Sequence, residues 1–213
     1  MTQEEYTFPF STCETVHSTG IAQPYSFWVN FINCAIIFYF LIQTKHNYTK
    51  PLLFSIFCFE LFHLFSHYQH IPGLLHTYLA HALTYGINAT AFFAFYSYSG
   101  KIPNHKIILL LLLLICFDLY ALFSAFPLIF YVLSQAAIFI VLLVCYFSSL
   151  PVFIQQGVCP IVVLIGFIIL LMLNEKYNCV KMRNFSPDFP FHIFIEITGI
   201  VLFYVICSRF YML

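Results

Sequence analysis

Long, uninterrupted apolar blocks constrain this chain more than any other feature. A helix needs about 20 mostly apolar residues to cross a bilayer, and the sequence contains seven blocks of about that length. Hydrophobic residues make up 62% of the 213 residues and charged residues only 8%, whereas a soluble domain is nearer a quarter charged. We therefore predict an all-α polytopic membrane protein, a single seven-helix bundle over residues 1–213. Its spans are expected at 25–43, 51–70, 74–97, 107–126, 128–149, 158–174 and 191–211.

The distribution of Lys and Arg between the short loops predicts the orientation in the membrane. One side would carry five basic residues, Lys45, Lys50, Lys101, Lys106 and Arg209. The other would carry three, Lys176, Lys181 and Arg183, together with an acidic N-terminal segment. We expect the N-terminus outside or in a lumen and the C-terminus in the cytosol, and "outer" below means the N-terminal side. A net charge of zero argues against a nucleic-acid partner and leaves membrane lipid as the expected surroundings.

Several ionisable side chains lie within the predicted spans, where each is costly and by default marks a functional site. If the spans alternate in direction, residues far apart in sequence fall at one depth, in the outer third of the membrane. These residues are Ser66, His70, His81, His192 and Glu196. On the second span, Glu60, His63 and His67 share a helix face with His70 and are expected to line a hydrated cavity. His76 would point about 140° away from His81.

Three imidazoles and a carboxylate at one depth are a ligand set that suits zinc and leaves room for a water molecule. We predict a Zn²⁺ site made by His70, His81, His192 and Glu196. A proton relay through the same groups is the main alternative. Asp118, in the fourth span, is expected to be buried near mid-membrane and to pair with Glu60 or a histidine.

The same residues resemble the motifs of the alkaline ceramidase superfamily, which includes the adiponectin-receptor-like proteins. That group is marked by Ser-x3-His on helix 2, an Asp some eleven residues later, and His-x3-His on helix 7. Ser66-HYQ-His70 matches the first motif, His81 stands at the Asp position, and His192-IFI-Glu196 carries Glu in place of the second His. The residues that match the family's entry segment in type are Cys13, Glu14, Trp28 and Asn33.

This resemblance implies a seven-helix hydrolase that cleaves the amide bond of a ceramide-like lipid with zinc. His70, His192 and Glu196 would hold the metal, and His81 would be a fourth ligand or the general base. Ser66 would donate a hydrogen bond to the developing oxyanion. Ser66 and His81 are therefore the expected catalytic residues.

Two other functions fit the same residue pattern. One is a receptor or sensor with a structural metal, and the other is a proton-coupled transporter that uses Glu60, Asp118 and the histidines. Cys13 and Cys179 both fall on the outer side, where an oxidising compartment would allow them to form a disulfide.

Overall fold

The computed structural model describes residues 13–14, 17, 20–69, 73–124, 128–186 and 189–213. The prediction of an all-α fold is confirmed over these residues. The helices are α1 (Pro24–Gln43), α2 (Lys50–Tyr68), α3 (Gly73–Ser99), α4 (His105–Phe123), α5 (Leu128–Tyr146), the short 3-10 helix η2 (Phe147–Ser149), α6 (Val152–Phe185) and α7 (Ile193–Phe210).

Six of these helices are long and apolar enough to cross a membrane, which fits an integral membrane protein. They are α1, α2, α4, α5, α6 and α7. Helix α3 has 27 residues, more than the about 20 that a helix needs to cross a bilayer. However, it carries a series of polar side chains that includes His76, His81 and Asn88. A seventh span at α3 therefore remains a prediction.

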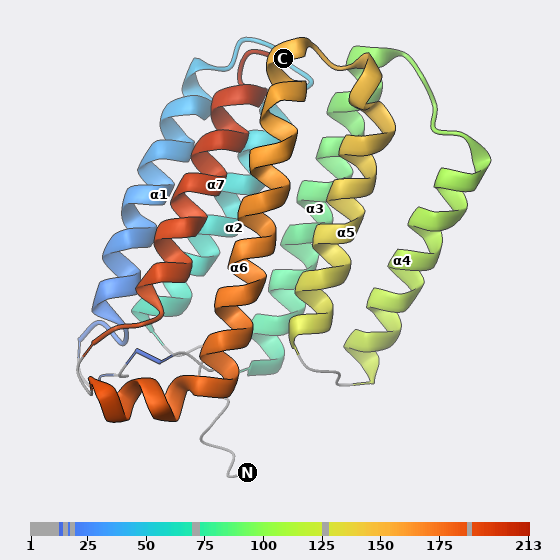
Figure 1. Cartoon of the computed structure of the whole chain (residues 1–213). Helices are drawn as coiled ribbons and strands as arrows, with labels where there is room; N and C mark the ends of the chain where they lie inside the picture. Colours follow the sequence, from blue (N-terminus) through green and yellow to red (C-terminus); the bar gives the residue numbers. More distant parts are fainter. Residues whose placement is uncertain (1–12, 15–16, 18–19, 70–72, 125–127, 187–188) are drawn as a thin grey trace.

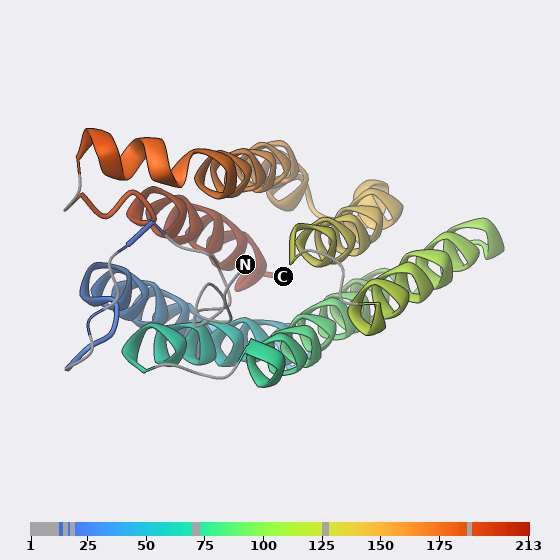
Figure 2. The same ribbon diagram turned by 90° about the horizontal axis from the view of Figure 1, so that it is seen from below.

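Six helices form a closed ring in the order α1, α2, α3, α5, α6 and α7, with α7 packed back against α1. Figure 2 shows this arrangement end-on, with α4 outside the ring at the edge of the molecule. Helix α4 packs mainly against α5, and its apolar side chains face outward. The ring therefore brings α2 and α7, which are far apart in sequence, to the same side of the bundle.

The bundle has an apolar half and a polar half. Its hydrophobic core gathers residues from the ends of the helices that lie near the C-terminus, such as Leu53, Phe95, Leu143 and Phe210. Buried polar side chains gather in the half that contains the start of α1, among them Gln23, Asn30, His67 and Glu196. In Figure 1 the C-terminus lies at the opposite end of the bundle from the start of α1. The apolar half stabilises the fold, which leaves the other half able to hold a polar site.

Helix α6 is much longer than the span predicted for it, which ended at residue 174. It continues as a helix through the polar stretch to Phe185, 34 residues in all. In Figure 1 its last turns bend and lie across the N-terminal end of the bundle. Glu175, Cys179 and Arg183 follow one another at intervals of four on this extension, which places them on one face.

The segment before α1 docks onto the end of α2. The backbone N–H groups of Ala22 and Gln23 donate to the carbonyls of Tyr68 and His67, at 3.1 and 3.0 Å. These bonds satisfy carbonyls that the last turn of α2 leaves without an intrahelical partner. The carboxylate of Glu14 accepts from the backbone N–H of Tyr25 at 2.9 Å, so it caps the start of α1.

Candidate metal centre

Two pairs of polar residues meet inside the polar half of the bundle. His63 and His67 lie one turn apart on α2, and His192 and Glu196 lie one turn apart at the start of α7. Each pair has the i, i+4 spacing that places both side chains on one helix face. Helices α2 and α7 turn these faces toward each other, and the four side chains are buried or nearly so.

The ring nitrogens of the three histidines converge on one oxygen of Glu196. The Nε2 atoms of His63 and His67 each lie 3.3 Å from Glu196 Oε1. His192 Nε2 lies 2.7 Å from the same oxygen. The Nε2 atoms of His63 and His67 are 3.1 Å apart. One carboxylate oxygen is therefore surrounded by three imidazoles.

The outer nitrogens of two of these rings are bound to oxygen acceptors. His67 Nδ1 lies 2.6 Å from Gln23 Oε1, and His192 Nδ1 lies 2.8 Å from Glu175 Oε2. Because amide and carboxylate oxygens accept hydrogen bonds, both Nδ1 atoms must donate and carry the hydrogen. In these two rings, when neutral, Nε2 carries no hydrogen and lies within 3.3 Å of a carboxylate oxygen, itself an acceptor. A cation, either a metal ion or a proton, would stabilise such a group of acceptors.

The distances between three of these atoms are compatible with a shared metal ion as well as with hydrogen bonds. A tetrahedral zinc ion with bonds of about 2.0–2.1 Å holds its ligand atoms about 3.3 Å apart. The three separations among His63, His67 and Glu196 are 3.1, 3.3 and 3.3 Å. These three residues can supply one ligand atom each to a shared ion. His192 is the candidate for a further ligand, although its Nε2 lies closer to the same oxygen, at 2.7 Å.

The second oxygen of Glu196 is also held in place. Asn30 Nδ2 donates to Glu196 Oε2 at 2.9 Å and to the backbone carbonyl of Ser26 at the same distance. Partners that fix the orientation of a metal ligand are typical of metal sites in proteins. Helix α1 therefore contributes no ligand of its own but positions the carboxylate between α2 and α7.

The residues predicted as ligands are distributed differently. His192 and Glu196 belong to the cluster, whereas His70 lies outside the described residues. His81 contacts other groups: its Nδ1 lies 2.9 Å from the Thr77 carbonyl, and its ring is tilted against Tyr131 with centroids 3.9 Å apart. Among the described residues, His63 and His67 are the histidines of α2 that lie beside Glu196.

Ser66, the expected oxyanion donor, is fully buried, and its hydroxyl donates to the carbonyl of His63 at 2.6 Å. Its hydrogen therefore goes to the backbone of its own helix. This bond fixes the last turns of α2, next to the two histidines that point into the cluster.

A second buried carboxylate, Asp118, lies between α3, α4 and α5. It accepts from Tyr85 Oη at 2.6 Å, from Gln135 Nε2 at 2.8 Å and from the hydroxyl of Ser134. His81 Nε2 lies 3.7 Å from Asp118 Oδ2, a distance too long for a hydrogen bond, so the pairing of Asp118 with a histidine stays a prediction. We call this group the Asp118 cluster.

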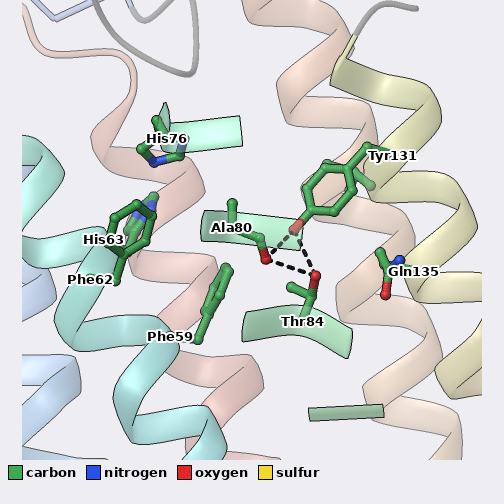
Figure 3. A pocket seen from close by; sticks show the side chains of 9 residues that line it. Phe59, Phe62, His63, His76, Ala80, Thr84, Tyr131 and Gln135 are labelled. Atoms are coloured by element: carbon green, nitrogen blue, oxygen red, sulfur yellow. Dashed lines mark hydrogen bonds between the residues drawn. The ribbon is translucent and has the colours of Figure 1, made fainter. Parts of the chain in front are cut away.

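A cavity of about 140 Å³ separates the two groups. Figure 3 shows His63, Phe59 and Phe62 on its α2 side and Tyr131 and Gln135 on its α5 side. His76, Ala80 and Thr84 of α3 complete the wall. The Tyr131 hydroxyl donates to the Ala80 carbonyl at 3.0 Å and lies 2.9 Å from the Thr84 hydroxyl. The cavity is thus largely aromatic and apolar, with a few polar groups and one edge formed by a metal-site histidine.

Three residues of the site were not assigned to it from the sequence. His63 and His67 were interpreted as cavity lining, although their spacing of four matches that of His192 and Glu196. Glu175 was interpreted as part of a loop. The repeated i, i+4 pairing on two helices was the signal available for the histidines. Nothing comparable in the sequence indicated Glu175.

The fold and this site define a helical membrane protein with a buried centre of histidines and a carboxylate. Comparison of the chain with protein-family models, with curated proteins and with solved structures finds no match. The function is therefore argued from the site alone.

Proposed function

We propose that this chain is a membrane-embedded, zinc-dependent hydrolase that cleaves the amide bond of a ceramide-like lipid. The observation that carries the proposal is the convergence of three Nε2 atoms on Glu196 Oε1, with the Nδ1 atoms of two of the rings bound to Gln23 and Glu175. The motif resemblance points to the same chemistry and adds the class of lipid.

His63, His67 and Glu196 would hold the metal. Catalytic zinc sites typically have three protein ligands and one exchangeable position, so with His192 as a further ligand the water would take a fifth position. A zinc ion bound there supplies a nucleophilic water at neutral pH and polarises the substrate carbonyl. The protein's own contribution is to fix the ligands: Gln23, Asn30 and Glu175 each bind one of them.

The cavity beside His63 supports an apolar substrate with a polar group. Its walls carry Phe59 and Phe62 on one side and the polar residues Thr84, Tyr131 and Gln135 on the other, where their polar groups are already hydrogen-bonded within the protein. Ligand sites of this kind combine an apolar lining with a few polar groups that fix orientation. A lipid whose amide lies next to His63 would place its apolar chains against the aromatic lining and its polar group near the polar residues of the wall.

A proton shared among the same atoms would also stabilise the cluster, and it would favour a proton relay or a transporter. A measurement of metal content distinguishes a zinc centre from a shared proton, because only the zinc centre is sensitive to chelators at constant pH. A receptor with a structural metal is separated by turnover, since it would bind zinc without cleaving a lipid amide.

The test is elemental analysis of the full chain, purified in detergent, together with an assay of fatty-acid release from ceramide. We expect about one zinc per chain and hydrolysis that chelation removes and added zinc restores. His67→Ala should lose both zinc and hydrolysis. Asp118→Asn is the matched control, because it changes a buried carboxylate on the other side of the cavity. A folded, metal-free preparation would exclude the proposal, and zinc without hydrolysis of any acyl amide would favour the receptor.

A further inference from the structure

Glu175 is a buried carboxylate at an unexpected position. It lies on the extension of α6 that crosses the N-terminal end of the bundle, yet only 6% of its surface is exposed. Burial of a carboxylate is costly unless strong hydrogen bonds compensate for it. Glu175 has two such partners: its Oε2 lies 2.8 Å from His192 Nδ1, and its Oε1 accepts the backbone N–H of Cys13.

We propose that Glu175 is a positioning residue that fixes the tautomer and the direction of the His192 ring. Because both oxygens of Glu175 act as acceptors, Nδ1 of His192 must carry the hydrogen. The other nitrogen, Nε2, is then held toward Glu196 Oε1 at 2.7 Å. Carboxylate–histidine pairs of this kind orient metal ligands and raise their basicity. The effect on metal binding rests on the proposed function, whereas the effect on the ring does not.

The N-terminal segment holds Glu175 in place from the other side. Cys13 is bonded to Cys179, one turn after Glu175 on the same face of α6, with the two Cα atoms 5.5 Å apart. One turn further, Arg183 donates to the backbone carbonyls of Cys13 and Glu14, at 3.5 Å in each case. The prediction that Cys13 and Cys179 pair is thus confirmed. The disulfide and Arg183 anchor the backbone N–H that binds Glu175.

Two measurements on the full chain in detergent micelles test the proposal. The first is zinc affinity, measured by competition with a chelating indicator. The second is the ¹⁵N NMR chemical shifts of the His192 ring, measured in histidine-labelled protein from which metal has been removed with a chelator. The His192 signals are assigned by their disappearance in His192→Gln. Glu175→Ala removes the acceptor, Glu175→Gln retains an acceptor oxygen without the charge, and Asp118→Asn is the control for a carboxyl-to-amide change elsewhere.

We expect Glu175→Ala to weaken zinc binding by about 10–100-fold, the usual effect of removing such a partner. The His192 ring should change from one tautomer, with the hydrogen on Nδ1, to a mixture of both. Glu175→Gln should retain the tautomer and recover part of the affinity, and Asp118→Asn should change neither.

The proposal is overturned if Glu175→Ala leaves both the zinc affinity and the His192 shifts as they are in the parent chain. If the parent chain binds no zinc, the proposed hydrolase is wrong, but the ring shifts still decide the role of Glu175. A tautomer that is fixed in the parent and mixed in Glu175→Ala would then support positioning, and unchanged shifts would contradict it.

Discussion

Two of the buried carboxylates, Asp118 and Glu196, lie on opposite sides of one cavity, and their surroundings differ in kind. Asp118 is bound by donors, the hydroxyls of Tyr85 and Ser134 and the amide of Gln135. Glu196 receives one hydrogen bond from an amide, that of Asn30, and its other oxygen faces imidazole nitrogens. Three donors can stabilise a buried charge without any further ion. A neutral imidazole whose Nδ1 already carries the hydrogen cannot stabilise the charge in this way, because its Nε2 has no hydrogen to donate.

This difference shows that the number of buried charges does not by itself identify a site. Both carboxylates have histidines nearby whose Nδ1 atoms are bound to oxygen acceptors: the Thr77 carbonyl for His81, and Gln23 and Glu175 for His67 and His192. The two groups differ in the number and distance of the imidazoles. Three Nε2 atoms lie within 3.3 Å of Glu196 Oε1, whereas one lies 3.7 Å from Asp118 Oδ2.

The most direct test of this difference is to replace each of the two carboxylates by the corresponding amide. Glu196→Gln removes the charge that a divalent ion requires, so we expect zinc content to fall from about one ion per chain to a small fraction. Asp118→Asn should leave the zinc content unchanged, because the hydroxyls of Tyr85 and Ser134 can rotate to suit an amide. Elemental analysis of both variants measures this, and equal losses of zinc would contradict the distinction.

Removal of the disulfide should affect only the side of the molecule that contains Glu196. The double variant Cys13→Ser, Cys179→Ser frees the N-terminal segment, and we expect a loss of about 2–4 kcal/mol in the free energy of unfolding. Zinc affinity should fall less than in Glu175→Ala, because Glu175 itself remains. Unfolding in detergent and chelator competition measure the two effects. The unpaired, exposed residues Cys116 and Cys159 provide the matched control, as a double Ser variant that should change neither quantity.

The spans were largely predictable because the bilayer fixes the length of an apolar helix. The first, second and seventh predicted spans agree with α1, α2 and α7 to within about two residues at each end. The end of α6 was not predictable in this way. Its last turns are polar, and polarity indicates where a chain leaves the membrane but not where its helix ends. For that reason Glu175 was placed in a loop.

The site was predictable in part, because alternating directions of the helices place His192 and Glu196 near the end of helix 2. That His63 and His67 of helix 2 also reach Glu196 was not predicted. These two residues lie one turn apart, about 40° around the helix. The relative height of two helices depends on loops and packing far from the site, and a local motif cannot supply it.

Truncation of Asp118 should destabilise the fold without altering the metal. Asp118→Ala leaves the amide of Gln135 and two hydroxyls without their acceptor, and buried unsatisfied groups of this kind cost about 1–3 kcal/mol. We expect a lower temperature of unfolding in detergent and an unchanged zinc content. A loss of zinc that exceeds the loss of folded protein would show that the two clusters are coupled through the cavity.

The smallest effect is expected from removing one donor from Asp118. Ser134→Ala removes the hydroxyl that contacts Asp118 and the Tyr131 carbonyl and leaves Tyr85 and Gln135 in place, so the free energy of unfolding should fall by about 1 kcal/mol. The corresponding deletion at the other carboxylate is Asn30→Ala, which removes the donor to Glu196 Oε2. Asn30→Ala should lower zinc affinity, since it frees a ligand oxygen to rotate, whereas Ser134→Ala should not. If both deletions lower stability alone and leave zinc affinity unchanged, Glu196 is held by hydrogen bonds in the same way as Asp118. The cation would then have no role in distinguishing them.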